Sequence, residues 1–243
     1  MKLRRCSKIV IGLPLKYFPG AIALAFSVAT AGAQVGHLPA ESPFVDLPGG
    51  HELTFFGGHY SAGRDPVGVA PRSGPLFGLR YEKTVGGPAA LMVRYARVSS
   101  ERFAFDPTVV GAAAALGRKS VGLNLVDVNL AVNLTGQKSW HSIVPVVNLG
   151  AGIASCSCSV EGDPYKFGTP FAFSLGAGLR YVTSGRFQLR VDLNDYLYQL
   201  KYPNAYYAPA AVGSPPLAAP KQAKSFWKNN LGLTLGASFL FFR

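Results

Sequence analysis

The sequence predicts an all-β fold: an eight-stranded, antiparallel, up-and-down transmembrane β-barrel preceded by a cleavable signal peptide. Three observations predict it. Apolar residues alternate with small or polar residues through many short segments, and the connections between these segments are alternately short and long. The last segment, 229–243, alternates most strictly, because its odd positions from 231 to 241 are apolar and its even positions from 232 to 238 are Gly, Thr or Ser. An even strand number, short turns at one end and long loops at the other are typical of such barrels.

The closing segment favours a barrel over a soluble sheet. No Pro, Asp or Lys interrupts residues 231–243. A soluble edge strand this long, flat and apolar would aggregate, whereas a closed barrel in lipid pairs every backbone group and leaves no edge. The rest of the chain is therefore expected to close around this strand.

Composition and charge point the same way. The 243 residues are 49% hydrophobic and only 15% charged, with 28 glycines. After residue 33 no run of about 20 apolar residues could cross a bilayer as a helix. The formal net charge of +12 includes five basic and no acidic residues before residue 34, so the remaining 19 basic and 12 acidic residues give +7. This moderate excess, without a basic helix or cluster, excludes a nucleic-acid partner and favours contact with an anionic surface.

The chain is expected to have three parts. Residues 1–33 indicate a signal peptide, with a basic start, an apolar run at 21–29 and a small-x-small cleavage pattern at 31–33. A retained membrane anchor is the alternative. Residues 34–51 contain three prolines and no usable periodicity, so we expect an extended lead-in. The barrel then covers 52–243.

Eight strands are expected, at 52–61, 76–83, 89–98, 120–134, 143–155, 170–182, 186–200 and 229–243. The second places Leu79 and Tyr81 on one face and Arg80 on the other, and Gly78–Tyr81 recurs as the sequence Gly-Leu-Arg-Tyr at 178–181. The third alternates in the same way. We expect both tyrosines to face lipid near the periplasmic interface and both arginines to point inward.

The fourth strand changes phase along its length. Val128 and Leu130 have even numbers and take the face away from Asp127. Val121 and Leu125 have odd numbers and would take the same face as Asp127. We therefore expect a β-bulge or twist near residues 125–126.

The remaining strands complete the pattern. The fifth and sixth share a Leu-Gly-Ala-Gly core at 149–152 and 175–178, where glycine predicts close packing of a large neighbour. The seventh places Leu189 opposite Arg190 and Asp192. Short connections at 84–88, 135–142 and 183–185 alternate with long ones at 62–75, 99–119, 156–169 and 201–228. A soluble β-sandwich has no reason to place all its long loops at one end.

Seven charged residues are expected on the inward face, namely Arg80, Glu82, Arg94, Asp127, Arg180, Arg190 and Asp192. The interior of an eight-stranded barrel is only wide enough for side chains to fill it, and an unpaired buried charge is costly. We therefore predict a network of salt bridges. The network would fill and rigidify the barrel, and the alternative is a gated or narrow conduction path.

Other candidate sites carry weaker signals. Cys156 and Cys158 are the only cysteines after the signal segment, and we consider a disulfide between them, free or intermolecular thiols and, least favoured, a metal site. His141 precedes Ser142, but adjacent side chains on a strand point to opposite faces, so no catalytic residue, metal or cofactor is expected. The long loops hold a basic excess whose candidate contacts to lipopolysaccharide phosphates are Arg118, Lys119 and Lys166. A solvated loop surface is the alternative.

The arrangement resembles the small eight-stranded outer-membrane barrels, the class that includes the OmpA transmembrane domain and OmpX. The resemblance covers residues 52–243 and rests on strand count, loop asymmetry, the polar inner face and the aromatic-rich closing strand. It implies an outer-membrane protein inserted by the barrel-assembly machinery, which would read the aromatic end at Phe241 and Phe242.

The function expected from this reading is non-enzymatic. The long loops would serve envelope structure, adhesion or surface binding by a monomer in contact with outer-membrane lipid and lipopolysaccharide. A narrow channel for small or apolar solutes is the alternative, and a lipid-modifying enzyme is a third and weaker one.

Overall fold

The structure is a computed structural model that describes residues 42–241, and the expected signal peptide lies outside them. Eight long strands form the barrel: β2 (His51–Ala62), β3 (Gly74–Gly86), β4 (Ala89–Phe105), β5 (Ala115–Asn133), β7 (Ile143–Ser157), β8 (Phe171–Val182), β9 (Phe187–Lys201) and β10 (Ser225–Phe241). Two short strands and two 3-10 helices complete the fold: β1 (Phe44–Asp46), β6 (Lys138–Trp140), η2 (Gly111–Ala114) and η3 (Asn204–Tyr207). None of the helices in this described part is long and apolar enough to cross a membrane.

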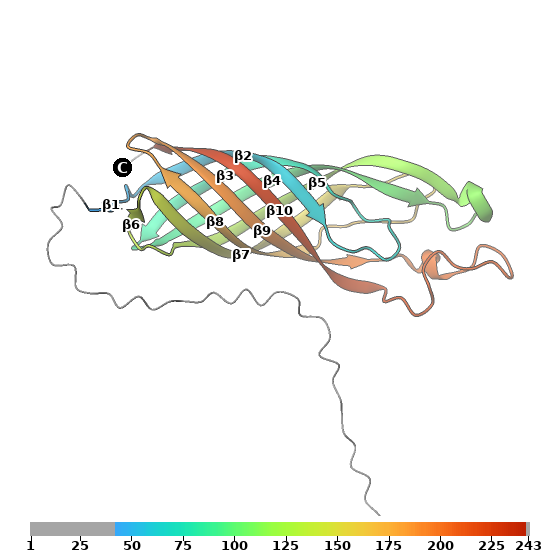
Figure 1. The fold of residues 1–243 in the computed structure, drawn as a ribbon. Helices are drawn as coiled ribbons and strands as arrows, with labels where there is room; N and C mark the ends of the chain where they lie inside the picture. Colours follow the sequence, from blue (N-terminus) through green and yellow to red (C-terminus); the bar gives the residue numbers. More distant parts are fainter. Residues whose placement is uncertain (1–41, 242–243) are drawn as a thin grey trace, which may run out of the picture. The chain divides into compact units, whose positions relative to one another are not determined.

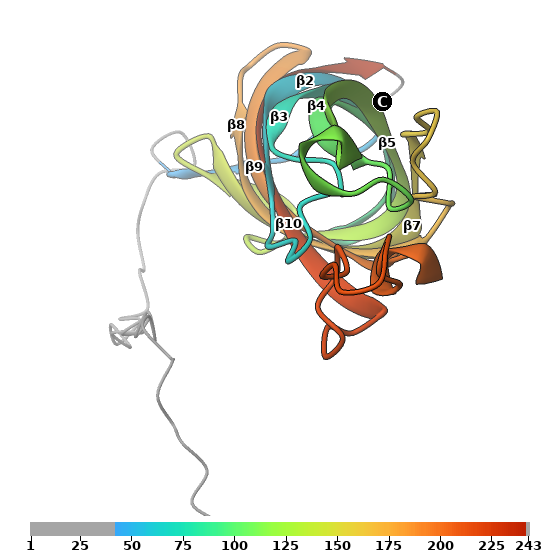
Figure 2. The ribbon, with the colours of Figure 1, turned by 90° about the vertical axis from the view of Figure 1, so that its right-hand side faces the viewer.

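The barrel closes by antiparallel pairing of its first and last long strands. β10 pairs with β2 from Asn230↔Ala62 to Phe241↔His51, and each remaining long strand pairs with its neighbour in the order of the chain. Figure 2 looks along the barrel and shows the closed ring. The predicted fold class is therefore confirmed.

Short and long connections lie at opposite ends of the barrel. The turns at 87–88, 134–142 and 183–186 lie together with β1 and β6, and the loops at 63–73, 106–114, 158–170 and 202–224 lie at the far end (Figure 1). The loop expected at 99–119 is much shorter than predicted. β4 and β5 continue to pair beyond the apolar belt, up to Phe105↔Ala115, because a two-stranded ladder needs no apolar face to continue into water.

The predicted bulge in the fourth strand is absent. Residues 125 and 126 keep a continuous register with β4 on one side and β7 on the other. Val121, Leu123 and Leu125 point inward, and so do Asp127 and Asn129. The change of phase in the sequence therefore marks a change in the interior, from apolar near the loops to polar in the middle, and not a backbone irregularity.

Part of the expected lead-in forms a strand. β1 pairs with β6 from Phe44↔Trp140 to Asp46↔Lys138, and the backbone N–H of Leu47 donates a hydrogen bond to the carbonyl of Gln137 at 2.8 Å. Both short strands lie in segments without usable alternation. The N-terminal segment is thereby attached to the turn between β5 and β7, at the end of the barrel that has the short turns.

The outer face of the barrel is an apolar belt with aromatic side chains towards both ends. Leu235 and Leu175 are 62% and 60% exposed, as expected for side chains that face lipid. Tyr181 is exposed near the short turns, whereas Tyr81 is half-buried and its hydroxyl lies 2.5 Å from His51 Nδ1. Trp227 is exposed near the loop end. These rings fit the two interfaces of a membrane.

Candidate functional site

The middle of the barrel holds a layer of paired charges. Its members are four arginines and four carboxylates: Arg80, Arg94, Arg180, Arg190, Glu52, Glu82, Asp127 and Asp192. Seven of these are the side chains that the sequence placed inside, and each forms at least one ion pair. The layer is balanced in charge, which is the condition under which buried ions are tolerated.

Glu82 on β3 is the centre of this network. Its carboxylate lies 2.5 Å from Nη1 of Arg190, 2.7 Å from Nη2 of Arg180 and 3.2 Å from Nε of Arg80. Only Arg180 keeps some exposure, at 11% of its side chain. One carboxylate therefore joins arginines from three strands, β3, β8 and β9.

Asp192 completes the same network from β9. Its two oxygens lie 2.8 Å from Nη1 of Arg80 and 2.9 Å from Nε of Arg190. Arg94 and Asp127 form a separate pair at 3.1 Å between directly opposite positions of β4 and β5. Except for Arg80–Glu82 within β3 and Arg190–Asp192 within β9, these contacts join different strands, so the network resists changes in barrel shape.

Glu52 was missed by the sequence reading. It lies 3.3 Å from Nη1 of Arg180 and begins the inward series Glu52, Thr54, Phe56 on β2. The alternation of this strand could have revealed it, because Leu53 and Phe55 take the outward positions.

Two clusters of apolar and aromatic side chains fill the rest of the interior. Met92, Val144 and Val146 are buried together at the level of the charges, because Met92 stands opposite Glu82 and Val144 opposite Arg180 in the strand register. Towards the loops, the rings of Tyr60, Tyr196 and Tyr198 belong to a larger buried cluster. Its members are Phe56, Tyr60, Ala70, Leu76, Ala96, Val98, Leu123, Leu125, Ala154, Ala172, Tyr196, Tyr198 and Leu200. The Tyr60 and Tyr198 hydroxyls are 2.8 Å apart, and the Arg94 guanidinium lies 5.0 Å from the Tyr196 ring centre. Side chains therefore fill the interior beside the charges and between the charges and the loops.

Two amides in the interior are incompletely paired. Both polar side-chain atoms of Asn148 and the Oδ1 of Asn194 are buried without a hydrogen-bond partner. A β-carbon on Gly176 would approach both amides closer than 3.0 Å, so the glycine makes room for them. Buried amides of this kind are sites for bound water or a small polar solute.

The loop end has a buried core of its own. Arg102 Nη1 lies 2.8 Å from Oδ2 of Asp163, and both side chains are fully buried. The Tyr206 hydroxyl donates a hydrogen bond to Asp163 at 2.5 Å, and the Tyr202 hydroxyl donates one to Asp65. Burial, together with the neighbouring carboxylates, raises the pKa of both tyrosines, so they remain neutral donors. The sequence places both residues in the expected long connections and gives no sign of this pairing, which forms because the loops fold over them.

The two cysteines are joined in this region. Cys156 and Cys158 form a disulfide, with their Cα atoms 5.2 Å apart, and the carbonyl of Cys158 accepts a hydrogen bond from Nε of Arg102 at 2.9 Å. The disulfide therefore lies beside the buried Arg102–Asp163 pair. Among residues 42–241 no group of three or more His, Cys, Asp or Glu side chains is placed to hold a metal ion.

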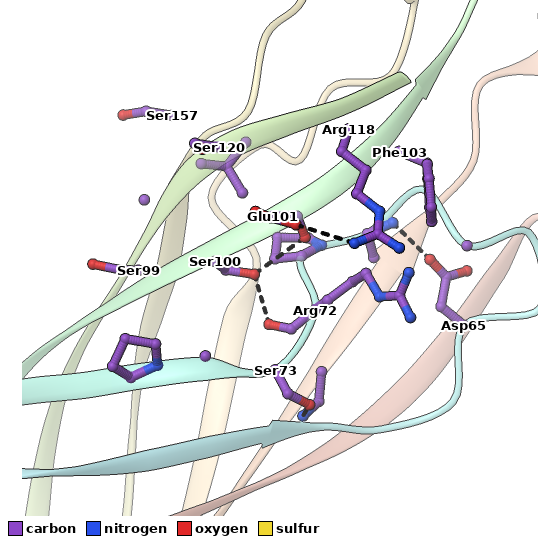
Figure 3. A pocket seen from close by; sticks show the side chains of 18 of the residues that line it. Asp65, Arg72, Ser73, Ser99, Ser100, Glu101, Phe103, Arg118, Ser120 and Ser157 are labelled. Carbon is purple, nitrogen blue, oxygen red and sulfur yellow. Dashed lines mark hydrogen bonds and ion pairs between the residues drawn. The ribbon is translucent and has the colours of Figure 1, made fainter. Parts of the chain in front are cut away.

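A cavity of about 1,080 Å³ opens at the loop end of the barrel, beside β4 and β5 and the loop that joins β2 to β3. The guanidinium groups of Arg72 and Arg118 lie 5.3 and 5.2 Å from the ring centre of Phe103, and Figure 3 shows both pointing into the same space. Arg118, one of the candidate lipopolysaccharide contacts, lines the cavity, whereas Lys119 and Lys166 are exposed but do not line it.

Comparisons with known proteins find similarity at the level of the fold. No family model matches the chain, and no curated protein does. Among solved structures, Neisserial surface protein A is similar with a TM-score of 0.50 and 10% identity over 79% of this chain and 97% of its own. OprG from Pseudomonas aeruginosa has a TM-score of 0.47 and 11% identity over 82% of this chain and 100% of its own. AlkL, solved in lipid bilayers, has a TM-score of 0.45 and 15% identity over 86% of this chain and 97% of its own.

The first of these structures is matched over nearly its whole length, and its low identity limits the conclusion to architecture. That architecture agrees with the closed ring of eight long strands, the apolar belt and the charged interior described above. The chain therefore has the fold of the small eight-stranded outer-membrane β-barrels, the class of OmpA and OmpX.

Proposed function

We propose that this protein is a non-enzymatic outer-membrane barrel in which the strands form a closed scaffold and the loop end provides a binding surface outside the cell. The observation that carries the proposal is the filled interior, in which paired charges lie beside one buried apolar cluster and a larger apolar and aromatic cluster lies between them and the loops. A barrel filled in this way supports the loops rather than a flow of solute.

The loop end supports the second half of the proposal. Its loops share a buried core that includes Val69, Tyr165, Tyr202, Tyr206 and Ala218, contributed by three different connections. Loops that pack on one another present a defined surface, and defined surfaces bind with a smaller loss of conformational entropy than flexible ones.

The setting of this function is also proposed. A signal peptide cleaved after Ala33, insertion by the barrel-assembly machinery and a monomer surrounded by lipid and lipopolysaccharide are consistent with the apolar belt. Fractionation of expressing cells and mass spectrometry of the purified protein test this setting. An inner-membrane location, or a mature protein that keeps residues 1–33, would contradict it.

Conductance in planar bilayers tests the closed scaffold. Wild-type protein refolded in detergent is expected to give no discrete conductance steps. The rival function is a narrow channel, which the unpaired amides of Asn148 and Asn194 favour. Discrete steps that disappear in the double variant Asn148→Leu/Asn194→Leu would establish the channel and overturn the scaffold. An Asn229→Leu variant, changed on the outer face, is the matched control.

A further inference from the structure

The outer-face cavity lies where the wall of the barrel changes from apolar to polar. Along the outward face of β4, Val93 and Tyr95 are followed by Arg97. On the paired strand β5, Val126 stands opposite Tyr95 and Asn124 stands opposite Arg97, so both strands change at the same level. In a membrane this level corresponds to the headgroups of the outer leaflet, with lipid tails against the belt below.

Three arginines gather around this cavity: Arg72, Arg97 and Arg118. Within residues 42–241 neither Arg72 nor Arg97 forms an ion pair. Arg118 has only a long one, 3.8 Å from Glu101, in which both side chains are more than half exposed. Such an exposed pair contributes little, so the guanidinium groups remain available to a ligand.

The neighbouring side chains hold these groups in place. The Phe103 ring contacts both Arg72 and Arg118, and a guanidinium group beside an aromatic face is favourable. Arg97 lies against Gly122, where a β-carbon would come within 2.9 Å of its Nη2, so the glycine leaves room for it. Its Nη1 also donates a hydrogen bond to Asn124 at 3.4 Å. The arginines are therefore positioned by residues other than carboxylates.

The lining has a net positive charge. Its cations are the three arginines and Lys228, and its anions are Glu101 and Asp65. Asp65 is already used, because it accepts hydrogen bonds from the backbone of Val67 and Ala70 and from Tyr202. Lys228 donates to the carbonyl of Pro71. Ser99 and Ser120 add hydroxyl groups at the lining (Figure 3).

We propose that this cavity binds the phosphate group of lipid A, the phosphorylated glycolipid anchor of lipopolysaccharide. Arginine binds phosphate through paired, charge-assisted hydrogen bonds, which three guanidinium groups around one space can supply. The acyl chains of the same molecule would lie on the apolar belt beside Tyr95 and Val126. This inference rests on the proposed outer-membrane location, and it assigns lipid binding to Arg118 with Arg72 and Arg97 rather than with Lys119 and Lys166.

The test measures how tightly two triple variants, refolded in detergent, bind fluorescent bisphosphorylated lipid A. Arg72→Gln/Arg97→Gln/Arg118→Gln is expected to weaken binding by at least about tenfold. The control, Lys119→Gln/Lys166→Gln/Lys221→Gln, removes the same charge from exposed positions outside the cavity and is expected to change binding by less than about twofold. Phe103→Leu, which keeps every charge, is expected to give an intermediate loss.

Competition with other probes identifies the source of the phosphate. Unlabelled lipid A is expected to displace the probe, whereas dephosphorylated lipid A, phosphatidylglycerol and inorganic phosphate are expected to compete poorly. Equal binding by the two triple variants, or equal competition by phosphatidylglycerol or inorganic phosphate, would overturn the proposal. Heat-modifiable gel migration checks that each variant is a closed barrel. Because conductance is measured separately, failure of the lipid site and failure of the closed scaffold are distinguishable.

Discussion

Arginine occupies two contrasting environments in this barrel. Arg80 and Arg190 lie inside, fully buried and within 2.5–3.2 Å of carboxylates. Arg72 and Arg97 lie on the outer side, exposed and without an ion pair among the described residues. Alternation along β4 places Arg97 outside, whereas Arg72 lies in the loop that joins β2 to β3. The comparison teaches that interior charges satisfy one another and stabilise the fold, whereas the outer arginines leave their charge available for binding.

The largest expected effect is the loss of the central carboxylate. In Glu82→Gln three arginines lose an anionic partner in the buried layer. We expect the free energy of unfolding to fall by about 3–5 kcal/mol. Urea unfolding in detergent micelles, followed by gel migration, measures it. Glu101→Gln, which loses only an exposed pair, is the matched control, and an equal loss in both variants would remove the contrast between inside and outside.

The second prediction extends the comparison to the loop end. Asp163→Asn leaves Arg102 buried without its carboxylate, so we expect the loop core to weaken by about 3 kcal/mol while the barrel keeps its β-structure. Cleavage at Lys166 by trypsin should then accelerate by about a hundredfold. The control is Asp106→Asn, which changes an exposed carboxylate. Hydrogen bonds from Thr108 lower the pKa of Asp106. Unchanged cleavage of Asp163→Asn would show that the loop core does not depend on this pair.

Removal of the disulfide should have a smaller effect. Cys156 and Cys158 are separated by two positions, and a cross-link that closes so short a loop restricts the unfolded chain little. We expect Cys156→Ser/Cys158→Ser to lower the free energy of unfolding by about 1.5 kcal/mol or less. A loss above about 3 kcal/mol in urea unfolding, beyond the chain-entropy value, would show that the disulfide also holds the adjacent Arg102–Asp163 pair.

The smallest stability effect is expected on the outer face. The triple variant at Arg72, Arg97 and Arg118 should unfold within about 0.5 kcal/mol of wild type, because exposed charges contribute little to folding. The same variant is expected to lose lipid A binding, which separates binding from stability in one protein. A destabilisation comparable with that of Glu82→Gln would mean that these arginines serve the fold.

Much of the fold was readable from the sequence because strand alternation is a local property. Whether a side chain points in or out depends on the parity of its position, so Arg80, Arg190 and Asp192 could be placed inside without knowing the register. The closing strand was an equally local signal, whereas the loop expected at 99–119 was overestimated because β4 and β5 pair beyond the apolar belt. The false bulge arose where parity was read from hydrophobicity alone, because the interior itself changes from apolar around Leu125 to polar at Asp127.

What only the tertiary structure decided is which residues meet. Register between strands brings Glu82 to Arg180 and Arg190. Loop packing places Asp163 against Arg102, and Arg72 beside Arg118 at the Phe103 ring. Some of these partners lie more than a hundred positions apart in the sequence, and no local pattern encodes their pairing. The sequence by itself determined the barrel and the faces of its strands, since both follow from a period of two. The ion-pair partners, the loop core and the outer-face cavity depend on strand register and loop packing, which arise only when the chain closes on itself.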